Sequence, residues 1–125
     1  MKKVLIIVFV LIGLTLNAQK TEVIITDTNG NVIERGYYNK QNQKDSIWYV
    51  YNDEGRVVIE TQYENGVKSG IWRMYNENGR VIFKILYVDG KMRKGKQWDD
   101  KGHLIDYRTW DSEENLVAEY RRYYY

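Results

Sequence analysis

Short runs of alternating hydrophobic and polar residues, separated by Asn, Asp and Gly, make up most of the chain after residue 19. Alternation with a period of two is typical of β-strands, and no stretch from Lys20 onward keeps the 3.6-residue period of an amphipathic helix. The expected strands lie near residues 22–26, 31–38, 46–51, 56–63, 67–75, 80–87, 91–98, 103–110 and 116–124. Because every connection is short, we expect consecutive strands to pair antiparallel in an all-β meander.

One turn formula recurs along the chain at spacings of 25, 24 and 23 residues, which indicates a repeat array. An aromatic residue or Thr is followed by four turn residues, one polar residue and one aliphatic residue, as from Tyr51 to Val57 and from Tyr75 to Val81. The fourth turn residue is a glycine in four copies, at Gly30, Gly55, Gly79 and Gly102. A type I turn followed by a left-handed residue explains this glycine, and it places Tyr75 opposite Val81.

A second set of turns lies at the other end of the strands. We interpret Asn65-Gly66 as part of a three-residue loop with Gly66 as a bulge, which pairs Ile59 with Ile71 and keeps the repeats in phase. The next repeat is one residue shorter, and there Gly90 is expected in a two-residue type I′ turn with Asp89. Asn42 precedes Gly66 by 24 residues, so it is expected in the same left-handed conformation.

This register distributes the apolar residues over both faces of a single twisted sheet. One face is expected to carry Val57, Ile59, Tyr63, Ile71, Tyr75, Val81, Phe83, Ile85 and Tyr87. The other is expected to carry Val58, Trp72, Met74, Ile82 and Leu86, with Trp48 and Val50 by repeat homology. Because a sheet of nine strands usually curls, the richer face is expected to line a concave side.

The first 18 residues have the organisation of a secretory signal peptide. Lys2 and Lys3 precede an almost unbroken apolar run from Val4 to Leu16, and Ala18 is a small residue at the cleavage position. The run is short for a membrane span, and no second apolar stretch follows it. We expect residues 1–18 to be cleaved and residues 19–125 to form one exported domain without a transmembrane span, in the periplasm or outside the cell. An uncleaved N-terminal anchor is the alternative.

Removal of the leader makes the chain electrically neutral. It leaves 17 of the 19 basic side chains against 17 acidic ones. Interspersed, balanced charges argue against nucleic acid as a partner, because that binding needs a basic stripe. The chain has no cysteine, so sheet pairing and aromatic burial have to stabilise it without disulfides.

Three stretches in the middle of the chain share a pattern with a known repeat family. They are Tyr63-Glu64-Asn65-Gly66, Gly70-Ile71-Trp72-Arg73-Met74-Tyr75 and Asn78-Gly79. The pattern resembles the bacterial variant of the MORN repeat, a short β-hairpin unit, over roughly residues 37–106. The resemblance implies a single meandering sheet and a scaffold or interaction role. Relatives are often labelled antitoxin components of toxin–antitoxin pairs, and other MORN repeats are linked to membrane association and dimerisation.

Few residues offer catalytic or metal-binding chemistry. The lone His103 follows Gly102 in a turn, at a position where the other copies have Asn or Arg. Without Cys and with one His, a zinc site of ordinary composition is not expected. Asp99-Asp100 could serve calcium binding or glycosidic acid–base chemistry, but Asp also favours the first positions of type I turns. We therefore expect no enzymatic activity, no metal and no cofactor.

Aromatic residues carry the most information about function, since the chain has 4 Trp and 12 Tyr. Exposed Trp and Tyr bind protein partners or stack on sugars, and in a one-layer sheet they also cover the backbone. The candidate interaction residues are Trp48, Trp72, Trp98, Trp110, Tyr120, Tyr123, Tyr124 and Tyr125. We predict a non-catalytic interaction or scaffold module with an unidentified protein partner. The alternatives are a binder of cell-envelope carbohydrate or lipid head groups, the latter through the basic residues between 91 and 101, and an antitoxin- or immunity-like protein.

The C-terminal strand is the expected association surface. It carries Tyr120 and a Tyr123–Tyr125 run beside Arg121 and Arg122, at one edge of the meander. An edge strand pairs readily with another chain. The partner there is a second copy, which gives a homo-oligomer, or another envelope protein. Alternatively, the tyrosines fold back and cap the last hairpin.

Overall fold

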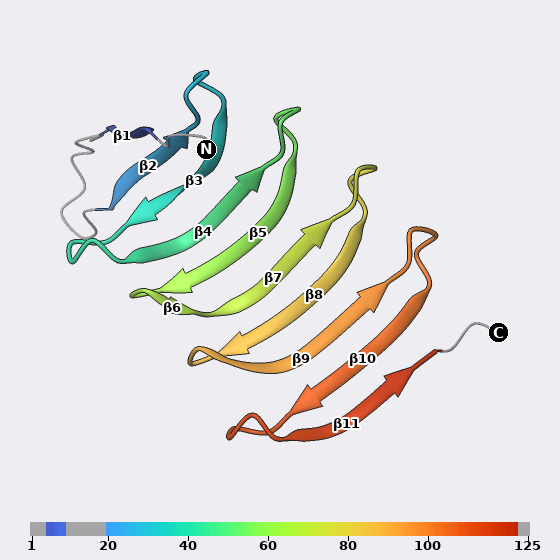
Figure 1. Cartoon of the computed structure of the whole chain (residues 1–125). Coiled ribbons are helices and arrows are strands. Elements are labelled where there is room, and N and C mark those ends of the chain that lie inside the picture. Colours follow the sequence, from blue (N-terminus) through green and yellow to red (C-terminus); the bar gives the residue numbers. More distant parts are fainter. Residues whose placement is uncertain (1–4, 10–19, 123–125) are drawn as a thin grey trace.

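The computed structural model describes residues 5–9 and 20–122, and these residues form β-strands joined by turns (Figure 1). The strands are β1 (Leu5–Phe9), β2 (Thr21–Thr26), β3 (Val32–Tyr38), β4 (Lys44–Tyr51), β5 (Val57–Glu64), β6 (Val67–Lys68), β7 (Gly70–Tyr75), β8 (Val81–Val88), β9 (Lys91–Trp98), β10 (Leu104–Trp110) and β11 (Leu116–Arg121). The predicted strand at 67–75 is therefore divided into β6 and β7.

All these strands lie in one antiparallel sheet in the order of the sequence, with β6 pairing only with β5. The predicted all-β meander is confirmed. The sheet is open, so the expectation of a curled sheet is wrong. Each hairpin adds to the previous one in the same direction, and β1 and β11 lie at opposite edges (Figure 1). β1 falls inside the predicted leader and pairs with β2.

The five-residue turns have the predicted geometry. Gly30, Gly55, Gly79 and Gly102 all have φ between 77° and 86°, and Tyr75 lies opposite Val81. The first turn residue closes each turn with its own side chain. In one copy, Oδ1 of Asn76 accepts hydrogen bonds from the backbone N–H groups of Asn78 and Arg80, both at 3.0 Å. Asn42 takes the left-handed position in its turn, as predicted, with φ of 57°.

A second irregularity follows each of these turns and was missed in the sequence. Tyr51 pairs with Val57 but Val50 pairs with Ile59, so Val58 is an extra residue in its strand. The same one-residue shift follows the turns at residues 27–31, 76–80, 99–103 and 111–115. The extra residues are Ile33, Val58, Ile82, Ile105 and Val117. A single inserted residue moves every later side chain to the other face.

The predicted division of faces is therefore wrong. Trp72 lies opposite Ile85, and Met74 lies opposite Phe83, so these residues share one face. Ile59 lies opposite Met74 and Val50 opposite Ile59, which extends the same face to Trp48 two residues before Val50. We call this side the tryptophan face, defined by Trp48, Ile59, Trp72, Met74, Phe83 and Ile85.

The turn at Asn65-Gly66 also differs from the prediction. Glu64 pairs with Val67, so the loop has two residues, with φ of 49° at Asn65 and 81° at Gly66. The pairing of Ile59 with Ile71 is wrong because the register moves by two residues between Lys68 and Arg73. Gly70, at φ 65°, lies in this insertion, and an even shift keeps the repeats in phase. Asp89-Gly90 forms the two-residue turn as predicted, with φ of 50° and 80°.

The most completely buried large side chain among the described residues is Trp48, which is 0% exposed. Its indole lies flat on Gly36 of the neighbouring strand β3, so that a methyl group at Gly36 would overlap the ring. Its Nε1 donates a hydrogen bond to the carbonyl oxygen of Tyr37 at 3.1 Å. Val23 pairs with Gly36 from the other side and is also fully buried. Gly36 is thus a glycine because the ring needs its space.

This contact gives the first testable prediction. Gly36→Ala should lower the free energy of unfolding by about 3 kcal/mol or more, because the indole has to leave its position. Denaturant unfolding measures the loss. Gly79→Ala is the matched control, since a methyl group there meets no atom within 4 Å and only the backbone strain of about 1–2 kcal/mol remains. In a Trp48→Leu background the Gly36→Ala cost should largely disappear, and an equal cost in both backgrounds would contradict this account.

Candidate interaction surface

Aromatic rings of consecutive strands stack on the tryptophan face. The ring centroids of Tyr38 and Trp48 are 5.3 Å apart, those of Tyr63 and Trp72 5.7 Å, and those of Trp72 and Tyr87 5.1 Å. The rings are tilted by 44° to 59°. Tilted aromatic pairs at these distances are favourable beyond the area that they bury. The repeat therefore builds an aromatic ladder across the central strands.

Two lysines cover this ladder. The ammonium of Lys44 lies 4.4 Å from the ring centre of Trp48 and 5.3 Å from that of Tyr63. Lys68 takes the same position one repeat later, 4.6 Å from Trp72 and 5.2 Å from Tyr87. Each lysine thus contacts two rings by cation–π attraction: the tryptophan four residues after it, and a tyrosine on the strand that pairs with that tryptophan's strand. Sequence reasoning missed these lysines, although their 24-residue spacing equals that of Trp48 and Trp72.

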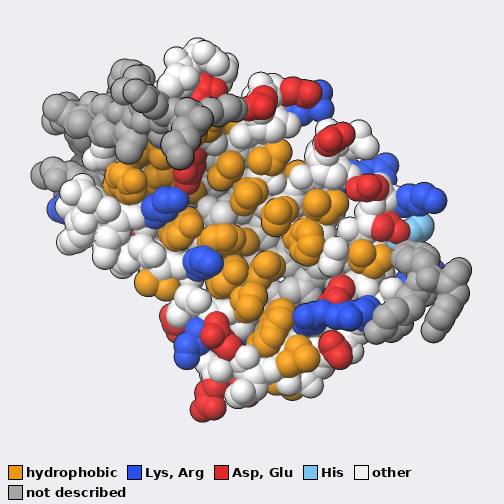
Figure 2. All heavy atoms as spheres, in the orientation of Figure 1, with side chains coloured by type: hydrophobic (Ala, Val, Ile, Leu, Met, Phe, Trp, Pro, Cys, Tyr) orange, Lys and Arg blue, Asp and Glu red, His pale blue; other side chains and the backbone are white. Residues whose placement is uncertain are grey.

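The cover ends in the third copy of the repeat. Met92 stands where the earlier copies have lysine, and Gly95 stands where they have tryptophan. Beside this gap lie the apolar side chains of Ile59, Met74, Phe83 and Ile85, which we call the apolar strip. Met74 is 40% exposed and the other three are half-buried. Figure 2 shows hydrophobic side chains gathered in a continuous band over the central strands of one face.

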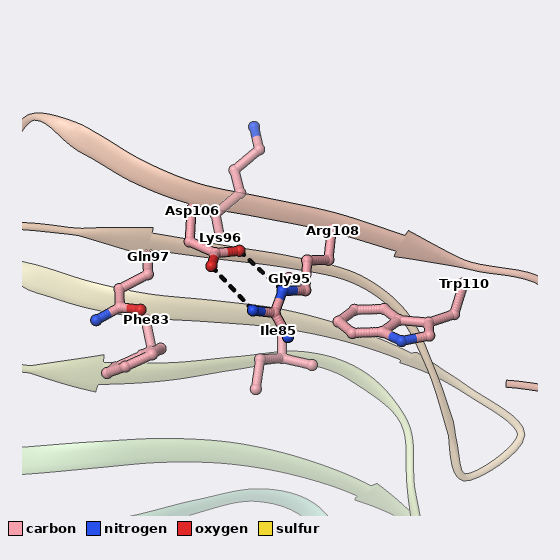
Figure 3. Close-up of a pocket in the computed structure, with 8 residues that line it drawn as sticks. All are labelled: Phe83, Ile85, Gly95, Lys96, Gln97, Asp106, Arg108 and Trp110. Atoms are coloured by element: carbon pink, nitrogen blue, oxygen red, sulfur yellow. Dashed lines mark hydrogen bonds and ion pairs between the residues drawn. The ribbon is translucent and has the colours of Figure 1, made fainter. Parts of the chain in front are cut away.

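A shallow hollow of about 220 Å³ lies at the end of the apolar strip (Figure 3). Trp110 and Phe83 stand on opposite sides of it, and the Trp110 ring lies on Gly95 at 3.2 Å from where a side chain would begin. Arg108 donates two hydrogen bonds to the carboxylate of Asp106, at 3.1 Å and 3.2 Å. Arg108 and Asp106 therefore lie between aromatic walls with their charges paired.

The shifted pKa values have structural causes. Burial raises the pKa of Tyr87 in the ladder, and the negative charge of Glu114 adds to this. Burial also raises the pKa of Tyr75, whose hydroxyl donates to Glu60 at 2.8 Å. Partial burial acts to raise the pKa of Asp45, but the backbone N–H of Asn65 and the ammonium of Lys20 outweigh it and lower this pKa. Asp45 thus anchors the Asn65-Gly66 turn to the preceding repeat.

The candidate interaction residues are spread over the sheet. Trp48 is fully buried, which leaves its side chain no surface for a partner. Trp72 and Trp110 are half-buried on the tryptophan face, whereas Trp98 pairs with Leu104 on the opposite face. Tyr120 is 50% exposed on β11. Tyr123, Tyr124 and Tyr125 lie outside the described residues.

The groups considered for chemistry are engaged in turns. Oδ1 of Asp99 accepts hydrogen bonds from the backbone N–H groups of Lys101 and His103, and its Oδ2 lies 3.1 Å from Nδ1 of His103. Asp100 accepts a hydrogen bond from the Asn76 side chain at 3.3 Å. Over residues 5–9 and 20–122, no three His, Cys, Asp or Glu side chains are grouped in a way that could hold a metal ion. The same part of the chain contains no helix long and apolar enough to cross a membrane.

The chain matches no protein-family model, and no curated protein matches it. The resemblance to the MORN repeat therefore stays a prediction from the sequence.

The lysine cover gives the second testable prediction. Lys68→Met keeps the apolar part of the side chain and removes the charge over Trp72 and Tyr87, so the free energy of unfolding should fall by about 0.5–1 kcal/mol. Denaturant unfolding at low and high salt measures it. Lys94→Met is the control, because Lys94 pairs with Leu86 on the opposite face. Equal effects of the two substitutions would show that the charge over the rings contributes nothing.

Proposed function

We propose that this chain is an exported, non-catalytic protein-interaction module built of MORN-like repeats, and that its partner binds the apolar strip of the tryptophan face. The observation that carries the proposal is the strip itself. Ile59, Met74, Phe83 and Ile85 adjoin one another over β5, β7 and β8, and the described chain places no second layer over them. Large contiguous apolar patches on soluble proteins mark interaction sites.

The exposed area supports the same proposal. The described strands form one sheet in which both faces reach the surface. One partner contributes roughly 800 Å² to an interface of standard size. A single-layer sheet can therefore give one face to a partner and keep its own strand pairing intact.

The charges beside the strip indicate the chemistry of the partner. Lys68 lies next to Trp72 with its ammonium over the rings, and Arg108 lies at the far end in the hollow. A protein surface with apolar side chains in its centre and carboxylates at its rim complements this arrangement. Acidic side chains at such a rim favour rapid association and correct orientation more than they add affinity.

A second candidate function is recognition of envelope carbohydrate at the hollow. Trp110 and Phe83 offer ring faces for a sugar, Asp106 and Arg108 offer hydrogen-bonding groups between them, and Gln97 offers its amide beside Phe83 (Figure 3). Sugars commonly bind where an aromatic ring lies beside such groups. The paired charges of Asp106 and Arg108 would both have to accept new partners, which makes this the weaker candidate.

The third testable prediction separates these functions. A photo-crosslinking residue in place of Met74 should capture one envelope protein, and the same residue in place of Ile47 should not. Ile47 is the matched control, since it is 38% exposed on the opposite face. The captured protein is then purified and titrated against the whole chain. Met74→Glu combined with Phe83→Glu should weaken its binding roughly a hundredfold, because two charges would be buried in an apolar contact.

Unchanged affinity of the Met74→Glu and Phe83→Glu double variant would contradict binding at the strip. Quenching of tryptophan fluorescence by envelope oligosaccharides, lost in Trp110→Ala, would instead support the carbohydrate function. A thermal melt of every variant controls for loss of fold.

A further inference from the structure

β11 forms an exposed edge of the sheet. It pairs with β10 on one side, and each of its six residues is exposed. Val117 is 66% exposed, the highest value among the large hydrophobic residues of the described chain. β11 contains no proline, and its residues 118–121 pair regularly with β10 beyond the bulge at Val117, although Glu119 and Arg121 carry charge. Such an edge is a template for another strand.

The backbone hydrogen bonds of β11 show which of its N–H and C=O groups point away from β10. The backbone N–H of Arg122 donates to the carbonyl oxygen of Ile105 in β10 at 2.9 Å. In an antiparallel strand the N–H and C=O of one residue point to the same side, and the side alternates along the strand. The polar groups of residues 118 and 120 therefore also point to β10, and those of Glu119 and Arg121 point to the outer edge.

We propose that two copies of this chain associate through β11, antiparallel and around a two-fold axis at Tyr120, so that Glu119 of each copy lies opposite Arg121 of the other. This surface is separate from the apolar strip, and the proposal does not depend on the partner that binds there.

The charge pattern selects this register. Residues whose backbone N–H and C=O groups face outward have to pair with each other. The allowed registers therefore differ from one another by steps of two residues. Centring the axis on Glu119 places two carboxylates opposite each other, and centring it on Arg121 does the same with two guanidinium groups. Centring it on Ala118 sets Glu119 opposite Val117. Only the axis at Tyr120 gives two opposite-charge pairs, and cross-strand pairs of opposite charge stabilise a sheet.

The side chains also fit on both faces. Glu119 pairs with Arg108 and Arg121 with Asp106, so both charged side chains project from the tryptophan face. Nε of Arg121 lies 3.3 Å from Asp106, and a guanidinium has five N–H donors, so Arg121 can hold Asp106 and a second carboxylate together. On the opposite face Tyr120 pairs with Tyr107. The dimer therefore aligns four tyrosines, from Tyr107 of one copy through both Tyr120 side chains to Tyr107 of the other.

The dimer has a consequence for binding. A two-fold axis perpendicular to the sheet joins the two meanders into one longer sheet with both tryptophan faces on the same side. Two apolar strips on the same side of one sheet, separated by β9, β10 and β11 of each copy, would bind a two-site partner with an effective concentration that one copy does not have.

The first part of the test locates the axis by cross-linking the full chain, which has no cysteine of its own. Tyr120→Cys places a thiol on the axis, in a non-hydrogen-bonded pair whose Cα atoms are about 4.5 Å apart, within the range for a disulfide. Under mild oxidation this variant should form a covalent dimer. Ala118→Cys is the matched control on the same face. In the proposed register residue 118 of one copy lies opposite residue 122 of the other, so the two thiols do not meet and this variant should stay monomeric. No dimer from Tyr120→Cys, or equal dimer from both, overturns the proposal.

The second part tests the charges by sedimentation. E119R and R121E should each weaken self-association roughly tenfold or more, because both cross-strand pairs become repulsive. An equimolar mixture of the two should associate again, since the two arginines of the first variant then face the two glutamates of the second. Circular dichroism confirms that each variant is folded. A wild-type chain that stays monomeric at about 100 μM, near the weak end of specific association, overturns the proposal, as does a mixture that fails to associate.

Discussion

The described chain forms a sheet of one layer, so the side chains of the sheet have to cover its hydrophobic face themselves. This cover is most complete where the indole of Trp48 lies on Gly36. The contact joins three strands, because Val23 pairs with Gly36 from β2. Trp72 repeats the indole hydrogen bond one unit later, with Nε1 donating to the carbonyl oxygen of Gln62 at 3.3 Å. The lysine ammonium groups then complete this cover. Regular strand pairing and aromatic cover together hold a fold with few fully buried residues.

Much of this fold could be predicted from the sequence because its turns depend on local chemistry. Glycine at a fixed place after an aromatic residue specified the tight turns, and the pairing of Tyr75 with Val81 followed directly. The faces could not be predicted in the same way. Ile82 is an ordinary strand residue, and nothing in its side chain marks it as the extra residue of a bulge. Because side chains alternate with a period of two, this one omission moved Trp72 and Met74 to the wrong side.

The turn at Asn65-Gly66 shows why the requirement that repeats stay in phase could not by itself determine the strand register. The three-residue loop keeps consecutive repeats in phase only if the strands contain no bulge or insertion. In the structure the bulge after each five-residue turn and the insertion at Gly70 restore the phase. The register shifts caused by these irregularities cancel over one repeat. A repeat period in the sequence therefore constrains the sum of the shifts, but it does not show at which residues they occur. The candidate surface depended on those positions, and its lysines and apolar strip became visible only with the register in hand.

The two edges of the sheet differ in what association through them would produce. In the full chain β1 pairs with β2, and cleavage after Ala18 would remove β1 and leave β2 as the edge. Pairing of β2 with β11 of another copy would join unlike surfaces, and a contact of that kind continues without limit unless its rotation closes a ring. Pairing of β11 with itself joins like surfaces and stops at two copies. At the β2 edge, Glu22 is bound by Arg35 from β3, which holds its charge within its own chain. In β11, Glu119 and Arg121 are two residues apart and have opposite charges. Two antiparallel copies of this strand can therefore place each glutamate opposite an arginine. The self-complementary edge therefore favours the closed assembly, which leaves the tryptophan faces open to a partner.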